Sequence, residues 1–384
     1  MSGTRTAEPA AEPAQETVAA ERAGGAVTLP GPAPARSAAA RAEMLSRLPT
    51  DAARRDYVRA MGAAYGNRDT ARLVARAQRR TLARLIDASA VEKIAKGAGG
   101  KPMAAHHLLW ELIHLFAPEK AFSLSGSTYE AAQKGFRLDG SALVIGDDVV
   151  ARVAKGDTTA VGQELKTALA GVADPFKQLA AGGVSVKDAP EHIGVPRVIQ
   201  EGAEAAWSKS LPGTKSKEQG GIIIEDSSGG YGYKAGKAGT GGTFSPNYGD
   251  VKKGEKLLGT LHTHPYSAKE GGHTDVSFSG ADLADMANQR DKIALVRSGD
   301  GWFAVATSKE FEARVTQAKS KRKLYKEIDK RWTQLFNAAT GNAKESAAVA
   351  TPKVCQEFQL LYYVGRDGSL SMPPDMAKAY KATP

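Results

Sequence analysis

Cysteine is nearly absent from this chain of 384 residues, in which Cys355 is the only one. A single cysteine excludes an internal disulfide and a cysteine-based zinc cluster, and we expect it to be a core thiol. Apolar runs are also short: none approaches the roughly 18 residues of a membrane-spanning helix, so we predict no membrane span. The first residues lack the basic and then apolar layout of a secretory signal. We therefore expect a soluble chain that, if it leaves the cell, does so without a conventional signal peptide.

Aromatic residues are missing from the first part of the chain, where Tyr57 is the first. Residues 1–39 consist mostly of Ala, Pro, Glu, Gly and Thr, which cannot bury enough apolar surface to offset chain entropy, so we predict a disordered arm. Residues 40–100 are rich in arginine and predict a helical segment. Within it, residues 64–78 (AYGNRDTARLVARAQ) resemble an N-terminal segment of proteins associated with extracellular contractile injection systems. That resemblance implies interaction with a loading machinery, and synthesis in a bacterial cytoplasm before secretion or injection.

Acidic residues are outnumbered, 42 against 52 basic ones, and the net charge of +10 would suit an anionic partner. Basic side chains gather at residues 319–323 (KSKRK), within a predicted amphipathic helix. Nucleic acid could bind such a run, but a solvated helical face explains it more simply. We therefore do not favour nucleic acid as the partner.

The middle of the chain and its C-terminal half differ in their pattern of predicted helices and strands. Residues 101–190 form a mixed region whose role the sequence leaves open. Residues 191–370 alternate strands with helices, which predicts an α/β domain with a sheet flanked by helices, and residues 371–384 are predicted to be a tail. In the middle region we predict helices over 103–116 and 158–182 and a strand pair over 136–153; beyond it, strands over 221–225, 257–264, 292–298, 302–308 and 358–364, and helices over 279–290 and 311–336.

Two histidines at the end of a predicted strand are the first sign of chemistry. Residues two apart on a strand point to the same face, so His262 and His264 present their imidazoles side by side. A catalytic zinc ion uses three protein ligands and leaves one position for water. Asp282, in the first turn of the next predicted helix, could supply the third ligand. The sequence therefore predicts a Zn²⁺ site made of His262, His264 and Asp282.

The pattern around Asp282 also has a purely structural explanation. Ser279 and Asp282 have the spacing of a capping box, in which both side chains bind free amides at a helix start. Taken alone, this pair indicates a cap. The two histidines on the preceding strand favour a metal site.

Together these residues resemble a known family of enzymes. HisThrHisPro at 262–265 followed by SerGlyAlaAsp at 279–282 is similar to the signature of the JAMM, or MPN/JAB, zinc metallopeptidases. That family also has a glutamate ahead of an apolar strand, and GluGlnGlyGlyIleIleIle at 218–224 fits this pattern. The resemblance covers roughly residues 190–310 and implies an MPN/JAB-like fold.

The resemblance also implies a role for each residue. His262, His264 and Asp282 would bind zinc, and Glu218 would be the general acid and base that moves a proton from water to the leaving amine. Ser279 would donate a hydrogen bond to the oxyanion of the tetrahedral intermediate. A substrate protein joined by a peptide or isopeptide bond, such as a ubiquitin-like conjugate, is the implied partner. Without the resemblance, Glu218 would be an exposed carboxylate in a lysine-rich loop.

The chain departs from the family in one place. The spacer between His264 and Ser279, residues 265–278, holds 14 residues, twice the family's usual length. Added loop length costs little free energy. The insertion could shape a substrate groove, or its His273 could act as a fourth ligand that silences the metal.

Two further patterns are weaker. His107, Glu111 and His114 share one face of a predicted helix; a second metal site is conceivable there, but a helix with apolar residues inward and histidines outward fits as well. Residues 229–242 are rich in glycine and follow a strand, yet no helix follows them, so they are not a phosphate-binding loop. We expect a mobile loop over the active site.

The sequence thus favours a zinc metallopeptidase delivered as a bacterial effector or toxin. Two alternatives stay open: a zinc-bearing binding module without proteolytic activity, and a metal-dependent nuclease acting on nucleic acid. Against the nuclease, the sequence lacks a second carboxylate cluster suited to magnesium.

Overall fold

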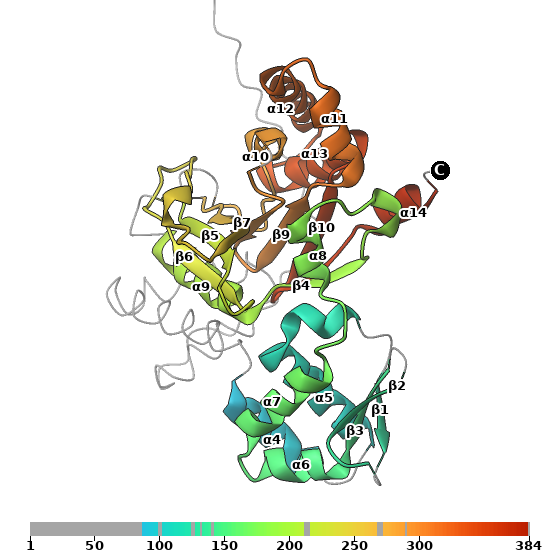
Figure 1. Cartoon of the computed structure of the whole chain (residues 1–384). Coiled ribbons are helices and arrows are strands. Elements are labelled where there is room, and N and C mark those ends of the chain that lie inside the picture. The colour runs from blue at the N-terminus through green and yellow to red at the C-terminus, as the bar shows by residue number, and fades with distance from the viewer. Residues whose placement is uncertain are drawn as a thin grey trace, which may run out of the picture. The chain divides into compact units, whose positions relative to one another are not determined.

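The computed structural model describes residues 87–98, 102–123, 127–130, 133–139, 142–210, 216–266, 272–288 and 290–382 (Figure 1). The predicted arm at residues 1–39 and most of the Arg-rich segment at 40–100 lie outside the described residues. So does the segment at 64–78, and these predictions stay predictions. The last part of the Arg-rich segment at 40–100 is described and forms helix α4 (Ala88–Ala98).

The region before residue 170 builds a small hydrophobic core of its own. A three-stranded sheet is formed by β1 (Ser127–Glu130), β2 (Phe136–Asp139) and β3 (Ala142–Gly146), in the order β1-β3-β2. It packs with helices α4, α5 (Pro102–Phe116), α6 (Asp147–Ala154) and α7 (Thr158–Ala168) around residues such as Leu108, Leu112, Leu143 and Val161. Helix α5 and the antiparallel β2–β3 hairpin confirm the predicted helix and the first part of the predicted strand pair. The short 3-10 helix η1 (Pro118–Ser123) follows α5.

Two predictions for this region are wrong in part. The second strand does not run to residue 153, because α6 begins at Asp147. Val149, Val150 and Val153 are buried at helical spacing, and acidic residues suit a helix N-terminus. The helix predicted over 158–182 is two helices, α7 and α8 (Pro175–Ala181). Asp174 caps α8 by accepting a hydrogen bond from Lys177 N, which starts a new helix.

The larger part of the chain is organised around an eight-stranded sheet in the order β4-β11-β10-β9-β8-β7-β5-β6. Neighbouring strands are antiparallel except β7 and β8, which are parallel and joined through α10 (Gly280–Asp285). The predicted α/β class with a sheet flanked by helices is therefore confirmed. The strands are β4 (His192–Gly194), β5 (Gly220–Glu225), β6 (Tyr231–Ala235), β7 (Lys256–Thr263), β8 (Ile293–Ser298), β9 (Gly301–Ala306), β10 (Leu361–Arg366) and β11 (Ser369–Ser371).

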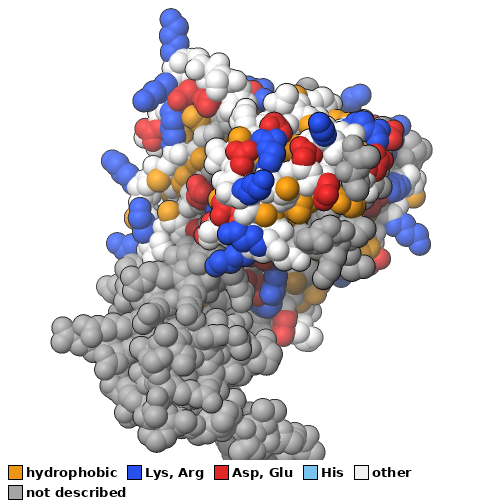
Figure 2. Space-filling model, turned by 90° about the horizontal axis from the view of Figure 1, so that it is seen from below, with side chains coloured by type: hydrophobic (Ala, Val, Ile, Leu, Met, Phe, Trp, Pro, Cys, Tyr) orange, Lys and Arg blue, Asp and Glu red, His pale blue; other side chains and the backbone are white. Residues whose placement is uncertain are grey.

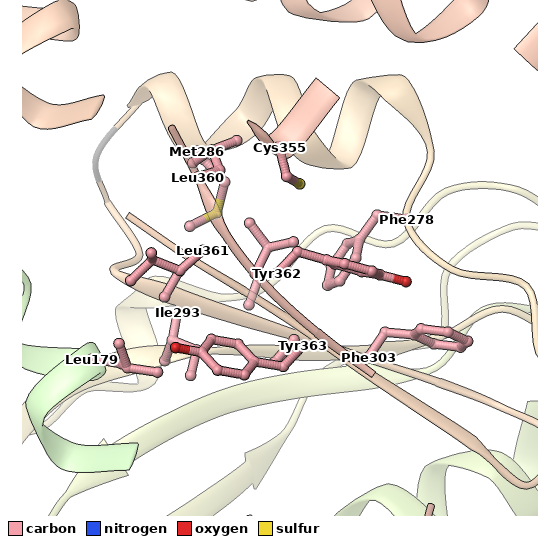
Figure 3. Close-up of a cluster of buried hydrophobic side chains, with 14 of the residues drawn as sticks. Leu179, Phe278, Met286, Ile293, Phe303, Cys355, Leu360, Leu361, Tyr362 and Tyr363 are labelled. Atoms are coloured by element: carbon pink, nitrogen blue, oxygen red, sulfur yellow. The ribbon is translucent and has the colours of Figure 1, made fainter. Parts of the chain in front are cut away.

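Helices cover both faces of this sheet because successive strand residues point to opposite sides. In Figure 3, Tyr363 lies on the side of Leu179 from α8, while Tyr362 lies on the side of Cys355 from α13. Cys355 is a buried free thiol, as predicted. The elements around the sheet are η2 (Val186–Asp188), α9 (Arg197–Ser210), η3 (Tyr248–Asp250), α10 (Gly280–Asp285), η5 (Met286–Asn288), α11 (Lys309–Gln317), α12 (Lys321–Ala338), α13 (Ala343–Phe358) and α14 (Pro374–Lys381).

Three boundaries in this half differ from the prediction. The helix predicted over 311–336 is two helices, α11 and α12, since the backbone is extended at Ala318 and again at Ser320, the N-cap of α12. The last strand starts at Leu361, after α13 has ended at Phe358. Residues predicted as a tail include α14, whose Met376 and Tyr380 are buried in the core. Within the described part of the chain, no helix is both long and apolar enough to cross a membrane.

Candidate metal centre

Strand β7 carries both predicted histidine ligands at its C-terminal end. His262 pairs with Gly220 of β5 on one side and with Val296 of β8 on the other. His264 follows the last strand residue, and its amide donates to Arg297 O at 2.9 Å. Their side chains point to the same face and are 9% and 6% exposed. Strand alternation therefore brings the two imidazoles together, as the sequence predicts.

Asp282 meets these imidazoles from the first turn of α10. The two Nε2 atoms are 3.0 Å apart. Asp282 Oδ1 lies 3.3 Å from His262 Nε2, and Asp282 Oδ2 lies 3.3 Å from His264 Nε2. All three ligand atoms lie within 4.8 Å of one another. Among the described His, Cys, Asp and Glu residues, this is the one group that could hold a metal ion.

Contacts behind the imidazoles fix their orientation. His264 Nδ1 lies 2.9 Å from Ser277 O. A carbonyl oxygen only accepts, so Nδ1 carries the proton and Nε2 of the neutral ring keeps its lone pair for the centre of the group. The ring of Phe244 stacks on His262 at a centroid distance of 6.3 Å. Both rings are thus held in place without using their Nε2 atoms.

Electrostatics favour an ionised carboxylate at this point. Burial raises the pKa of Asp282, but the charges and hydrogen bonds of both imidazoles outweigh it and hold that pKa well below its usual range. Burial lowers the pKa of His264, while Asp282 and Glu218 raise it, and the net shift is upward. A concentrated negative charge beside two imidazole nitrogens suits a divalent cation.

The spacing of the ligand atoms fits one ion. Bonds of about 2.0–2.1 Å meeting at a tetrahedral angle place two ligand atoms roughly 3.4 Å apart. The distances here, 3.0, 3.3 and 3.3 Å, are close to that value. The group could therefore hold a metal ion with only small side-chain movements.

Ser279 forms the capping box that was the structural alternative for this motif. Its hydroxyl donates to Asp282 Oδ2 at 2.7 Å, its amide donates to the same oxygen at 2.7 Å, and it accepts from Asp282 N. The cap and the metal group coexist, because these contacts hold Oδ2 and leave Oδ1 facing His262. In this geometry Ser279 orients the aspartate.

Glu218 lies beside the group, in the backbone that leads into β5. Gly220 faces His262 in the antiparallel register, so the same register two residues earlier puts Glu218 opposite His264. Thr263 N donates to Gln219 O at 2.9 Å, which continues the pairing to this point. Glu218 is 7% exposed. Burial raises its pKa, the charges of His262 and His264 lower it, that of Asp282 raises it, and the net shift is upward.

The glycine-rich run holds Glu218 in place, a function that the sequence did not reveal. Glu218 N donates to Thr240 O at 2.7 Å, and Gly239 N donates back to Glu218 O at 2.9 Å. A Cβ atom at Gly239 would lie 2.0 Å from Thr243 O, so this turn requires glycine. Part of the run predicted as a mobile loop is instead strand β6, which pairs with β5.

The long spacer does not deliver a fourth ligand from its described residues. His273 lies against Tyr266, with ring centroids 6.2 Å apart, and does not belong to the metal group. The end of the spacer contacts a strand and a helix: Asp275 N donates to Ser298 O of β8, and Asp275 Oδ2 pairs with Lys344 of α13 at 3.0 Å. Residues 267–271 lie outside the described residues.

A cavity of about 270 Å³ opens beside the metal group. His262 and Asp282 form one wall of it, and Phe244, Tyr248 and Asp291 are among the other lining residues. Sequence reasoning missed these three because no local motif joins them. The second histidine-rich region, on α5, is remote in sequence and forms no metal group among the described residues; His107 Nε2 lies 3.1 Å from Glu111 Oε1.

Compared with known proteins, the chain matches no family model, no curated protein and no solved structure. The likeness to the JAMM signature therefore rests on the motif residues of the sequence alone.

Proposed function

We propose that this chain is a zinc-dependent hydrolase of the JAMM/JAB type, which cleaves a peptide or isopeptide bond. The observation that carries the proposal is the convergence of His262, His264 and Asp282, with Glu218 on the adjoining segment. Two imidazoles and one carboxylate without sulfur are a ligand set of catalytic zinc sites, where three protein ligands leave one position open. A closed structural site would use a fourth protein ligand.

Zinc at this site would supply Lewis acidity, polarising a carbonyl oxygen and lowering the pKa of a coordinated water molecule to about 7. The chain's own residues supply the rest. Glu218 is the general base, accepting a proton from the attacking water, and then the general acid, passing that proton to the departing amine nitrogen. Its raised pKa suits both tasks, because an acid-base group works best when its pKa is near the working pH.

Ser279 has a narrower role in this proposal than the family resemblance implies. Its hydroxyl donates to Asp282 Oδ2, so that proton is committed to the carboxylate. Ser279 would support hydrolysis chiefly by orienting Asp282, and could donate to an oxyanion only after breaking this hydrogen bond. Loss of metal affinity in Ser279→Ala would fit the orienting role, whereas a loss of turnover at full metal occupancy would fit the oxyanion role.

Charge on the face drawn in Figure 2 gives no support to a nuclease. On the face drawn in Figure 2, Lys and Arg side chains are interspersed with Asp and Glu over the described surface. A nucleic-acid-binding face gathers basic side chains into a patch or stripe. The proposed substrate is therefore a protein, including conjugates of ubiquitin-like proteins.

Delivery of the enzyme as a bacterial effector by a contractile injection system is part of the same proposal. It rests on the resemblance of residues 64–78 alone. Fusing residues 1–100 to a reporter protein and measuring its incorporation into the particle tests it, and a reporter left in the cytoplasm would contradict it.

The test of hydrolysis compares wild-type protein with Glu218→Gln, both loaded with zinc, on peptides and on isopeptide-linked conjugates. We expect zinc to stay bound and turnover to fall by about 100-fold or more, the scale of losing a general base. Glu201→Gln and Glu225→Gln, neighbouring glutamates outside the group, are matched controls and should keep full activity. Full activity in Glu218→Gln would contradict the mechanism.

A further inference from the structure

The cavity beside the metal group has walls of two kinds. Phe244 and Tyr248 contribute aromatic faces, and Asp285 and Asp291 contribute carboxylates. Asp285 lies one turn after Asp282 on α10, and Asp291 lies just before β8. A chamber with flat apolar sides and acidic groups fits a ligand with an apolar stem and a cationic head.

Asp291 is the most strongly held of these carboxylates. Its Oδ2 accepts hydrogen bonds from Tyr248 Oη at 2.9 Å and from Thr260 Oγ1 at 3.0 Å. Its Oδ1 is buried, and among the described residues it has no hydrogen-bond partner. A buried carboxylate oxygen without a donor is costly and calls for one.

Of the three carboxylates that line the cavity, only Asp282 pairs with basic side chains of the described residues, His262 and His264. Within the described part of the chain, neither Asp285 nor Asp291 forms a salt bridge. Arg290 also lines the cavity, with its guanidinium over the ring of Tyr248, 5.3 Å from the centroid. Burial raises the pKa of Asp291, and the hydrogen bonds it accepts and the charge of Arg290 offset this only in part. Asp282 adds a third carboxylate, which serves the metal group.

We propose that this cavity is a subsite for a basic side chain, Lys or Arg, of the protein substrate. The cationic head pairs with Asp291 and Asp285, and the stem packs against Phe244 and Tyr248. The inference rests on the proposed function for its orientation toward a cleaved bond, but binding of the side chain can be measured without cleavage.

The position of the subsite predicts where the basic residue lies. Thr260, which binds Asp291, is two residues before His262 on the same face of β7. Two strand residues span about 7 Å, so an extended substrate reaches from the metal group to the subsite in about two residues. The enzyme should therefore prefer a Lys or Arg within two residues of the bond that it cleaves.

The test uses full-length Glu218→Gln loaded with zinc, so that cleavage does not disturb equilibrium binding. The probes are tripeptides Ala-X-Ala, acetylated and amidated to remove terminal charges, with X as Lys, Arg, norleucine or Glu. Dissociation constants come from ligand-observed NMR, and mass spectrometry checks that the peptides stay intact. Norleucine keeps an apolar stem without the ammonium group. We expect Lys and Arg to bind about tenfold more tightly than norleucine, the scale of a charged hydrogen bond.

Replacing Asp291 by Asn in the same background should remove this preference while keeping an oxygen that can accept from Tyr248 and Thr260. Asp285→Asn, which changes an exposed residue at the rim, should reduce the preference without affecting folding. Asp375→Asn makes the same charge change on exposed α14 and should leave the preference intact. Equal binding of Lys and norleucine, or a preference that survives Asp291→Asn, would overturn the subsite. A clear Lys preference without hydrolysis of any peptide by wild type would instead overturn the proposed function and leave the subsite standing.

Discussion

The chain presents histidines in two arrangements, at the end of strand β7 and along helix α5. At β7, residues two apart share a face, and a helix start from another segment brings Asp282 to them. On α5, His107 pairs with Glu111 at 3.1 Å and is 61% exposed, while His114 packs by Trp110. His107 and His114 are two helical turns apart, roughly 10 Å along the axis. A single helix face spreads its side chains, whereas a strand end and a helix start can direct theirs to one point.

The largest effect that this comparison predicts is on metal affinity. His262→Ala removes one of three ligands and should weaken zinc binding by more than about 100-fold, since changes in groups that only orient ligands already cost 10–100-fold. His107→Ala, the matched change on α5, should leave the affinity unaltered. Competition titration with a chelating dye measures both. Equal losses would mean that the two regions do not differ as the geometry indicates.

A smaller effect is expected from the residue that orients Asp282. Ser279→Ala should reduce zinc affinity by about 10–100-fold and the free energy of unfolding by about 1 kcal/mol, the value of an N-cap. Ser308, whose hydroxyl accepts from Phe311 N, caps α11 away from the metal group. Ser308→Ala should lower stability comparably and leave zinc affinity unchanged. Unaltered affinity in Ser279→Ala would show that the capping box does not support the metal group.

The support behind Glu218 can be tested apart from the metal. Gly239→Ala places a Cβ atom against Thr243 O, which should displace the backbone that holds Glu218. We expect turnover to fall by about tenfold, and the unfolding free energy by about 1–3 kcal/mol, the usual cost of overpacking, with zinc still bound. Gly242→Ala, whose Cβ would have no atom within 4 Å, is the control in the same run. Turnover and zinc content are measured on the same samples. A parallel loss of both in Gly239→Ala would contradict a role for this turn in holding Glu218 alone.

The smallest effect is expected on the pH dependence of the folding stability, through His114 of α5. Burial lowers the pKa of His114, and the charge of Glu111 raises it, with a net downward shift from 6.5. The unfolded chain therefore binds a proton that the folded chain excludes, and stability falls as the pH drops below about 6.5, by at most about 1.4 kcal/mol per pH unit. His114→Gln should reduce this loss in urea titrations between pH 7.5 and about 5. The same titrations of His107→Gln control for removal of one imidazole, and an unchanged profile in His114→Gln would refute the prediction.

Parts of the fold were predictable because their signals are local. The strand at 256–263 and the hairpin at 293–306 carry β-branched and apolar runs between turns, and both were placed within a residue or two. Errors arose where apolar spacing suited more than one structure. The apolar run through Val149 and Val153 also suits a strand, but it forms helix α6. Apolar residues on both sides of Ala318 continue the helical spacing, so the sequence does not indicate the break there.

The residues of the candidate site also differ in whether a local sequence pattern indicates them. His262, His264 and Asp282 could be found from strand alternation and a helix-start pattern, whereas Glu218 was selected by the family resemblance. Gly239 and Asp291 could not be foreseen. Each reaches the site through pairing between distant segments, which local periodicity does not encode.

X-ray absorption at the zinc edge, on full-length protein loaded with one equivalent of zinc, identifies the atoms that bind the metal. We expect a ligand set of two imidazoles, with oxygen in the remaining positions and no sulfur. In His262→Ala/His264→Ala the imidazole signal should vanish with the bound zinc. Three or more imidazoles in the wild type, or an unchanged spectrum in the double variant, would contradict this ligand set.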